Sequence, residues 1–495
     1  MNIELERNPA RDGRPVYRQI AEHFVREIEG GRLVHGSRLP PIRYLAQSLQ
    51  VNRDTVALAY DALSTAGLVE SSVGRGTFVR SATGPSGRAM QSREIRFSPL
   101  TENLLDLERA RPRFGNAADA VSMHSLVPDP SLYPVDAFRR VLGRVLQRHG
   151  SELLLYGGPE GYRPLREVVA GRLRAADIDV DAADVILCHG ASQGIHLATR
   201  LFAEAGDTVA LEEPTYNNVL AVMRGLGLRT APVPMGPDGT NLAALERILE
   251  RPEVKFLYAI PTHHNPMGIT TSAAHRRALL AIAARCGKPV VEDAYEMDLL
   301  LSGRHVPPLA ALDTSGLVVH LFSFSKSLFP GARVGAITAR GRSVNALLAL
   351  KQATDLADSM LLQAALAEFV SDGSYDRHLR KLRRVLLDRR DVLLRALERE
   401  MPEGVSWTRP EGGYQVWVEL PDGCDTGELL ADAIGAGVLF APGFQFNHDG
   451  RPSNCLRLTF AMAGSDELER GVKILAAVVR DRLARGESSV THVHI

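Results

Sequence analysis

The sequence predicts a multidomain α/β protein, with a small helical domain first, a large domain built on a mostly parallel sheet covered by helices, and a small C-terminal α+β part. Three observations support this fold class. The chain has 495 residues, a length that suggests about three domains. Beyond Met123, short apolar stretches alternate with helical segments, which is typical of a parallel sheet buried on both faces. Residues 1–80 instead show helical periods followed by a hairpin pattern.

The composition is that of a soluble globular protein, with 45% hydrophobic and 23% charged residues. The formal net charge is zero, so charge alone indicates no polyanionic partner. The cysteines are widely spaced, and we expect free thiols in a reducing compartment and no metal site. No apolar run approaches the ~20 residues that span a bilayer, and the N-terminus lacks the apolar core of a signal peptide. We therefore expect a cytoplasmic protein with no membrane partner.

The first elements are three helices. Apolar residues recur with a helical period from Pro15 until the glycines at 30 and 31. A second, short helix is predicted directly after Pro41, and Asn52 can cap a third helix that Gly67 ends. Two short helices joined by a tight connection make a helix-turn-helix. The third helix of this chain would then be the one that enters the major groove of DNA, with residues near its N-terminus reaching the bases.

A small hairpin follows the third helix. Residues 68–71 and 77–79 are predicted strands around the turn Gly74-Arg75-Gly76. The glycines allow the backbone to approach a groove closely, and Arg75 at the tip can enter a narrow minor groove or contact phosphate. The hairpin is therefore predicted to be a wing.

Together, the helices and the hairpin resemble the winged helix-turn-helix of the GntR family, through the segments PVYRQIAEHF, GSRLPPIRYLA, VNRDTVALAYDAL and GRGTFV. The resemblance implies that double-stranded DNA is a partner. It also implies that Arg43 and Arg53 contact bases or phosphate, with Thr55 on phosphate and Gly76 at the minor groove. Asn52 stands where the family usually has serine, and it keeps a residue that starts a helix. Taken singly, the two arginines would be solvated helix charges, an alternative that the complete motif outweighs.

The domain boundaries follow from these patterns. The DNA-binding domain is predicted at 1–80, and Gly, Ser and Pro residues then indicate a flexible linker, which we place at 81–120 with a partly helical segment around Thr101 to Arg109. The large domain is expected at 121–485, divided near residue 345 into a large and a small part. A short tail completes the chain at 486–495.

Seven apolar stretches are candidate strands of the large domain. Ligands of such sheets gather at the carboxyl ends of the strands, and the notable polar residues follow those ends. The predicted strands are Val185–Cys188, Thr208–Leu211, Leu228–Val233, Val254–Ile260, Pro289–Glu292, Leu317–Phe324 and Arg333–Thr338, separated in many places by the helical stretches Gln193–Ala205, Tyr216–Leu226 and Ala273–Cys286.

Lys326, one of only six lysines, follows a predicted strand in the segment SFSKSLFPGARVGA. A lysine that forms an imine with an aldehyde cofactor needs such a setting. Ser323 and Ser325 could donate hydrogen bonds to a phosphate, and Arg333 offers a planar fork that suits phosphate oxygens. The alternative is a surface lysine in a loop, but no other lysine of the chain has this serine-rich context at a strand end.

Other strand ends also carry polar residues. The turn Gly190-Ala191-Ser192 leads from a strand into a helix, where backbone N–H groups can bind phosphate. Tyr216 could stack on a pyridine ring or lie in the core, and Asn265 could donate to a phenolate or simply form an Asn-Pro turn. Asp293 ends a buried apolar strand, where an unpaired carboxylate is costly. A pyridinium nitrogen would pair with that carboxylate, which is the condition for the ring to act as an electron sink, and Tyr295 could donate to the phenolate.

In this order and spacing, these elements resemble a class I aminotransferase of fold type I, an enzyme class that uses pyridoxal 5'-phosphate (PLP). The resemblance covers residues 121–485 and implies that PLP is the cofactor. It implies that Lys326 is catalytic and forms the imine with PLP. It also implies that Asp293 binds the ring nitrogen of PLP and that Asn265 and Tyr295 bind its phenolate oxygen. It further implies that Tyr216 stacks on the ring and that Arg457 forms a bidentate contact with a substrate or effector carboxylate. In a homodimer, Tyr156 would contact the phosphate bound by the partner subunit. The other implied phosphate contacts are Ala191, Ser192, Ser323, Ser325 and Arg333.

A GntR-type winged helix joined to an aminotransferase-like domain resembles the MocR family of PLP-dependent transcription regulators. That layout implies a DNA-binding homodimer whose PLP-bearing domain senses a small amino compound or PLP itself. The main alternative is an active PLP-dependent aminotransferase that carries a DNA-binding module. A third possibility, a DNA-binding protein with an inert scaffold, is weakened by the presence of Lys326, Asp293 and Arg333.

Overall fold

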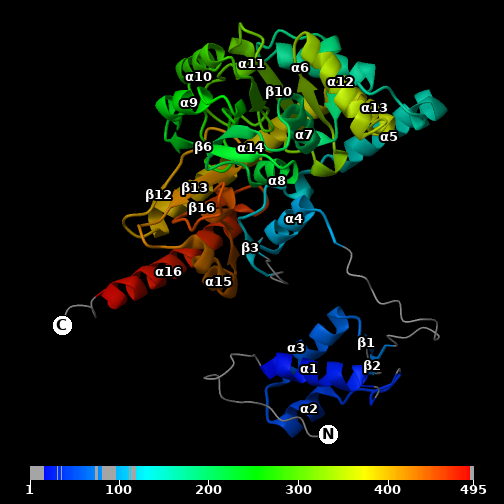
Figure 1. Cartoon of the computed structure of the whole chain (residues 1–495), viewed down its shortest axis with the longest axis vertical. Helices are drawn as coiled ribbons and strands as arrows, with labels where there is room; N and C mark the ends of the chain where they lie inside the picture. The colour runs from blue at the N-terminus through cyan, green and yellow to red at the C-terminus, as the bar shows by residue number, and fades with distance from the viewer. Residues whose placement is uncertain are drawn as a thin grey trace. The chain divides into compact units, whose positions relative to one another are not determined.

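The computed structural model describes residues 16–30, 32–34, 36–72, 76–80, 96–110, 112 and 119–490. The chain falls into two compact units, Met1–Arg96 and Phe97–Ile495 (Figure 1). Each unit has its own core and is described by itself.

The N-terminal unit consists of three helices and a two-stranded hairpin, as predicted. Its core contains Ile20, Phe24, Val56 and Leu63, each at most 1% exposed. The side chain of Asn52 accepts a hydrogen bond from the Asp54 amide at 3.2 Å, which confirms the predicted cap of the third helix. The elements are α1 (Val16–Glu29), α2 (Ile42–Leu49), α3 (Arg53–Thr65), β1 (Val69–Ser72) and β2 (Gly76–Val79).

The second unit contains an eight-stranded sheet in the order β4-β11-β10-β9-β8-β5-β6-β7. Only β11 and the two-residue β7 pair antiparallel with their neighbours, so the predicted mostly parallel sheet is confirmed. The strands are β4 (Val185–Cys188), β5 (Thr208–Glu213), β6 (Arg229–Gly236), β7 (Gly239–Thr240), β8 (Val254–Ala259), β9 (Val290–Asp293), β10 (Val318–Ser323) and β11 (Gly335–Thr338).

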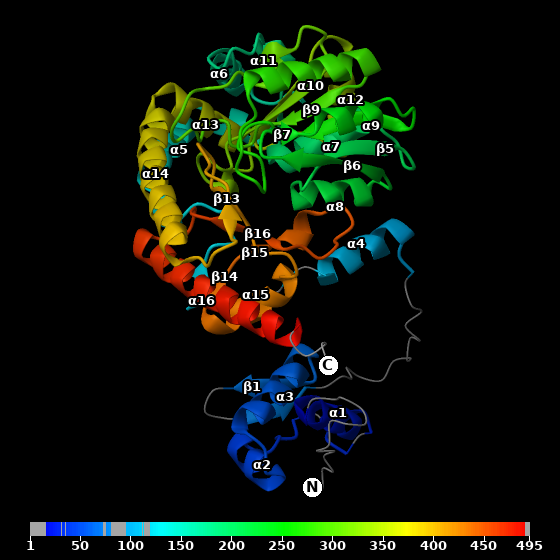
Figure 2. The ribbon, with the colours of Figure 1, turned by 90° about the vertical axis from the view of Figure 1, so that its left-hand side faces the viewer.

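Helices cover both faces of this sheet (Figure 2). Side chains alternate between the faces with a period of two, so that Val209 and Leu211 pack on one side while Ala210 packs on the other. One face is covered by α7 (Gly190–Phe202), α8 (Asn217–Gly225) and α12 (Arg342–Thr354), and the opposite face by α9 (Leu242–Leu249), α10 (Ala273–Cys286) and α11 (Leu309–Leu312).

Several predicted boundaries differ from the structure by one to three residues, and two of the differences bear on the site. The strand expected from Arg333 begins at Gly335, because Arg333 has the left-handed backbone conformation (φ 48°) of a turn. The helix expected from Gln193 begins three residues earlier, at Gly190, and this places the predicted phosphate-binding turn inside the first turn of α7.

The C-terminal part packs long helices around a small antiparallel sheet of order β12-β13-β16-β15. The leucines of the arginine-rich segment are buried along α14, as its helical spacing predicted. The last helix continues to Val490, past the predicted start of the tail. The elements are α13 (Met360–Ser371), α14 (Ser374–Glu400), β12 (Ser406–Trp407), β13 (Gln415–Glu419), α15 (Thr426–Ala436), β14 (Val438–Leu439), β15 (Ala441–Pro442), β16 (Cys455–Thr459) and α16 (Ser465–Val490).

The first strand of the second unit lies in this C-terminal part. The short strand β3 (Val121–Ser122) pairs with β14, so residues that precede the large sheet in the chain join the small part. The remaining helices of this region are α4 (Pro99–Ala110), which includes the helical segment predicted in the linker, α5 (Val135–His149) and α6 (Arg163–Arg174).

Candidate functional site

A cavity of about 260 Å³ lies in the second unit, where strand ends, the start of α7 and the small part meet. It brings together residues that are as much as 331 positions apart in the chain, because parallel strands end at the same edge of the sheet. All the predicted cofactor residues except Tyr156 line it. The lining residues are Leu126, Ala191, Ser192, Tyr216, Asn217, Asn265, Asp293, Tyr295, Ser323, Ser325, Lys326, Pro330, Arg333 and Arg457.

Lys326 lies in the turn that follows β10. Its Nζ donates a hydrogen bond to the backbone carbonyl of Leu126 at 3.0 Å. Burial lowers the pKa of Lys326 to about 8, and the positive charges of Arg457 and Arg333 act in the same direction while Glu296 opposes them. A lysine amine with a lowered pKa is more often neutral, and the neutral amine is the nucleophile that attacks an aldehyde.

Asp293 ends β9 and is 1% exposed. The Tyr258 hydroxyl donates to its Oδ2 at 2.7 Å, whereas Oδ1 accepts no hydrogen bond from the described residues. Burial raises the pKa of Asp293 to about 6, and the hydrogen bond from Tyr258 opposes this shift. A buried carboxylate oxygen without a partner is costly. The protonated ring nitrogen of PLP would supply the missing donor, so this part of the cavity fits the cofactor.

Asn265 is a second buried residue with an unused polar group. Its Oδ1 accepts a hydrogen bond from Nη1 of Arg457 at 2.8 Å, while its Nδ2 donates to no described residue. The amide nitrogen can therefore donate to a phenolate oxygen. The hydroxyl of Tyr295 accepts a hydrogen bond from Nε2 of Gln415 at 2.9 Å and keeps its own proton available for the same oxygen.

The other end of the cavity has the features of an anion site. The helix α7 begins there at Gly190, and the backbone N–H groups of its first turn point out of the helix. The Ser325 amide donates to the Ser323 hydroxyl at 3.2 Å, and Nη2 of Arg333 donates to the His189 carbonyl at 3.0 Å. Gly190 has a φ of 73°, a backbone conformation that favours glycine, and the Arg333 guanidinium lies in van der Waals range of it.

Arg457 is 7% exposed and comes from β16 of the small part. Its Nη2 donates to the His124 carbonyl at 2.8 Å, and its guanidinium lies over the Phe446 ring, 4.9 Å from the centroid. Burial lowers the pKa of Arg457 to about 10, which still leaves the group charged at neutral pH. The cavity therefore combines a reactive amine, a fixed cation and a set of unpaired polar atoms.

Glu296, Gln415 and Tyr258 were not predicted from the sequence, although all three are buried beside the predicted residues. Nε2 of Gln415 lies 3.1 Å from a Glu296 carboxylate oxygen, and burial raises the pKa of Glu296 to about 8. Glu296 directly follows Tyr295, so its position beside the predicted site was the available signal. Gln415 and Tyr258 lie in apolar strands that give no such signal.

Tyr156 lies outside the cavity and is 85% exposed. Leu154 and Leu155, each 71% exposed, precede it at the end of a short 3-10 helix. Three consecutive large exposed side chains form an apolar patch of the kind that marks a protein interface.

The N-terminal unit has its own groove, of about 450 Å³, between α2, α3 and the hairpin. Arg43, Arg53 and Gly76 line it together with Arg38, which was not predicted from the sequence. Gly76 has a φ of 114°, and a β-carbon there would lie 2.7 Å from Nε of Arg38. Thr55 is half-buried in the first turn of α3, and Arg75 lies outside the described residues.

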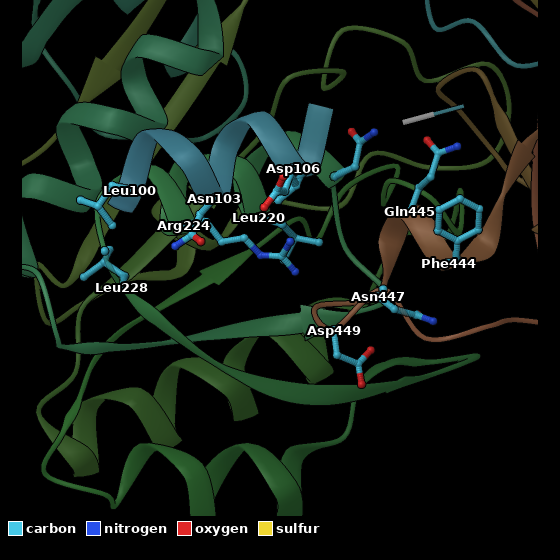
Figure 3. A pocket seen from close by; sticks show the side chains of 14 residues that line it. Leu100, Asn103, Asp106, Leu220, Arg224, Leu228, Phe444, Gln445, Asn447 and Asp449 are labelled. Carbon is cyan, nitrogen blue, oxygen red and sulfur yellow. The ribbon is translucent and has the colours of Figure 1, made fainter. Parts of the chain in front are cut away.

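A larger cavity of about 800 Å³ lies between α4, α8 and residues 444–450 of the second unit (Figure 3). Leu100 and Leu228 lie at one end of it, and Phe444 and Gln445 at the other. Its buried lining side chains are leucines, and none of its charged side chains is buried. Asn217 lines both cavities. The chemistry therefore belongs to the smaller cavity.

None of the helices in the described part of the chain combines the length and hydropathy that a bilayer crossing requires.

Both units match families of known proteins. Residues 131–475 match the family model of aminotransferase class I and II, and residues 16–79 match that of the bacterial regulatory proteins of the gntR family. An HTH-type transcriptional regulator of Bacillus subtilis, YdfD, is 30% identical over 95% of this chain and 98% of its own. The probable rhizopine catabolism regulatory protein MocR of Rhizobium meliloti is 30% identical over 86% of each chain.

Among solved structures, the α-aminoadipate aminotransferase LysN of Thermus thermophilus, in complex with N-(5'-phosphopyridoxyl)-L-leucine, is 33% identical with a TM-score of 0.70. The matched region covers 78% of this chain and 96% of the LysN chain. The cofactor of the domain is therefore PLP, in agreement with the prediction and with the unpaired atoms of the cavity.

Proposed function

Because this chain belongs to the MocR family, in which a GntR-type DNA-binding domain precedes a class I and II aminotransferase domain, we propose that its aminotransferase domain senses a small amino compound or PLP itself. The chain is a DNA-binding regulator, and binding at the small cavity would change how the two DNA-binding domains of a homodimer engage an operator. As a regulator of transcription, it would act in the cytoplasm.

The cofactor would be held by the residues that line the cavity. PLP supplies an aldehyde that reacts with primary amines and a ring that accepts electron density. Lys326 would anchor it, the Asp293 carboxylate would accept a hydrogen bond from the ring nitrogen, and Asn265 would donate to the phenolate with Tyr295. Tyr216 would stack on the ring. The phosphate would lie against the first turn of α7, with contacts from Ala191, Ser192, Ser323, Ser325 and Arg333.

The effector is proposed to be an amine that carries a carboxylate. Arg457 would receive the carboxylate as a charge-assisted pair, while the amine would compete with Lys326 for the cofactor. A ligand can shift a conformational equilibrium only if it binds one state better than the other. An amino acid that bridges Arg457 of the small part and Lys326 of the large sheet would favour a closed arrangement of those two parts.

The DNA contacts and the dimer belong to the same proposal. Arg43 and Arg53 would contact bases or phosphate from the groove of the N-terminal unit, with Thr55 on phosphate and Gly76 near the minor groove. The exposed patch around Tyr156 supports a homodimer, in which Tyr156 would reach the phosphate site of the partner subunit.

The observation that carries the proposal is the pair of buried atoms, Oδ1 of Asp293 and Nδ2 of Asn265, that face one cavity without partners among the described residues. The test is a footprint of the purified protein on the DNA upstream of its own gene, with and without PLP and a panel of amino acids. Discrete protection that changes with PLP or one amino acid is the expected result. Discrete protection that no addition changes would refute sensing while leaving DNA binding intact.

An active aminotransferase is the second candidate, because the groups that hold PLP in catalysis are all present in the cavity. Incubation with an amino donor and a keto acid distinguishes the two. Continuous formation of a new keto acid would favour the enzyme, whereas a single absorbance change that then persists would favour the sensor.

A further inference from the structure

Lys351 is a buried cation in α12, a helix that packs against α7. Its side chain is 0% exposed. Nζ donates to both carboxylate oxygens of Asp355, at 3.0 and 3.1 Å, and forms an ion pair with Asp358 at 3.1 Å. A buried charge is costly unless it is paired and hydrogen-bonded, so the lysine and the two carboxylates hold one another in place. None of these three residues lines the small cavity.

Successive hydrogen bonds lead from this cluster to the cavity. Oδ2 of Asp355 accepts from Nε2 of Gln193 at 2.6 Å, and Oε1 of the same glutamine accepts from the His189 amide at 2.8 Å. The His189 carbonyl in turn accepts from Nη2 of Arg333 at 3.0 Å. Lys351 is thus connected to Arg333, which the proposed function places on the cofactor phosphate.

The second carboxylate leads to the same residue. Nε2 of His189 lies 2.9 Å from Oδ1 of Asp358, whose other oxygen pairs with Lys351. His189 directly precedes Gly190, the first residue of α7, and its side chain does not cap the helix. The first N–H groups of α7 therefore stay available for an anion, while His189 itself is held through its amide and its ring.

From this geometry we propose that Lys351, Asp355 and Gln193 are positioning residues of the cofactor phosphate site. They act through His189, because Gln193 fixes its amide and its carbonyl holds the Arg333 guanidinium. The inference rests on the proposed function, which places the phosphate against the first turn of α7 and Arg333. Donors that converge on one ligand bind it well only when the groups behind them keep them in position. Loss of this support should weaken binding of the phosphate and leave the contacts to the pyridine ring unchanged.

The test compares PLP with pyridoxal, which has the same aldehyde and ring but no phosphate. Each is titrated into the cofactor-free protein, and the visible absorbance of the ligand attached to Lys326 reports binding. The ratio of the two dissociation constants, which we call the PLP preference, measures what the phosphate contributes. A loss of stability, or a change in the reactivity of Lys326, would alter both constants alike and leave this ratio unchanged.

Gln193→Met is the first variant, because methionine keeps the length of the side chain and removes both hydrogen bonds without leaving Asp355 unpaired. We expect its PLP preference to fall about 3- to 10-fold, which is the effect of losing one hydrogen bond of typical net strength. Its affinity for pyridoxal should equal that of the native protein.

Gln363→Met is the matched control. Gln363 is 1% exposed, its Oε1 accepts from the Tyr162 amide at 2.7 Å, and its Nε2 donates to Asp358 at 3.3 Å. It therefore also joins a backbone amide to a carboxylate that pairs with Lys351, but its bonds lead to the start of α6 and not to α7. Its replacement should lower the melting temperature and leave the PLP preference unchanged.

Lys351→Met tests the other end of the hydrogen-bonded series. It leaves two carboxylates without their cation, so its PLP preference should fall at least as far as that of Gln193→Met. If this variant does not fold, the comparison of the two glutamine variants decides the proposal.

An unchanged PLP preference in Gln193→Met, or an equal fall in Gln363→Met, would overturn the positioning role while the phosphate site stands. If the native protein binds PLP no more tightly than pyridoxal, the phosphate site of the proposed function fails, and the positioning role fails with it.

Discussion

Replacing Asp293 by Asn removes a charge from the floor of the cavity and keeps the shape of the side chain. Without cofactor, the Asp293 carboxylate is buried with one unpartnered oxygen, and its pKa is raised from 3.8 to about 6. This difference corresponds to about 3 kcal/mol of cost for holding the charge. Since the folded protein keeps this proton to a higher pH than the unfolded chain, the group lowers stability progressively from about pH 4 to pH 6, and the loss is complete above pH 6.

The asparagine side chain does not titrate, so any cost of burying its amide is the same at every pH. For pKa values of 3.8 and about 6, the free energy of unfolding of Asp293→Asn should therefore gain about 1.4 kcal/mol relative to the native protein between pH 5 and pH 8. The measurement is urea unfolding of both cofactor-free proteins at the two pH values. With PLP, the variant should bind the cofactor about 10- to 150-fold more weakly, because it lacks the charged acceptor for the ring nitrogen.

Glu292→Gln is the control, since Glu292 precedes Asp293 in the same strand and is equally buried. Burial opposes its ionisation, but hydrogen bonds from His320 and from the amides of Leu309 and Ala310 hold the pKa of Glu292 below its ordinary value. A carboxylate with a lowered pKa adds stability above its unfolded pKa, so this variant should lose stability relative to the native protein as the pH rises. Equal pH dependence of Asp293→Asn and the native protein, or unchanged PLP affinity, would refute the reasoning.

Three further substitutions test the other parts of the molecule. Lys326→Ala should abolish the visible absorbance of covalently held PLP, while the footprint measured without amino acids persists; retained absorbance would contradict the assignment. Arg457→Lys should weaken binding of amino acids about 10- to 100-fold in absorbance titrations and leave the PLP absorbance intact, because lysine cannot form the bidentate pair; equal affinities would exclude Arg457 as the carboxylate site. Gly76→Ala should reduce DNA affinity in gel-shift titrations more than Gly67→Ala does. Both glycines have positive φ, but only a β-carbon at Gly76 would meet a side chain, that of Arg38 at 2.7 Å. Equal effects of the two substitutions would show that the groove is not part of the DNA interface.

The local patterns of the sequence were sufficient to predict most of the framework. The bounds of β4 and α10 agree with the prediction to the residue, because strong apolar periodicity and clear end signals coincide there. Asn52 was predicted as a helix cap from its side chain and position alone. Asp293 was singled out because a carboxylate at the end of an apolar strand conflicts with its surroundings unless a ligand resolves the conflict.

Other features depend on contacts between residues that are distant in the chain. Tyr258 reaches Asp293 because β8 and β9 are neighbours in the sheet, and nothing in its own apolar strand distinguishes it from a core tyrosine. Arg333 was placed in a strand, whereas the structure has it in a left-handed turn that brings its guanidinium to the start of α7.

The sequence alone determined the order of the two domains, the cofactor class and the residue types that surround it, because those depend on local patterns and on side-chain chemistry. Only the tertiary structure decided which polar atoms remain unpaired and that the backbone carbonyls of residues 124–126 accept hydrogen bonds from Arg457, Thr459 and Lys326. Every residue possesses a backbone carbonyl, so no choice of amino acid in residues 124–126 could have revealed these contacts.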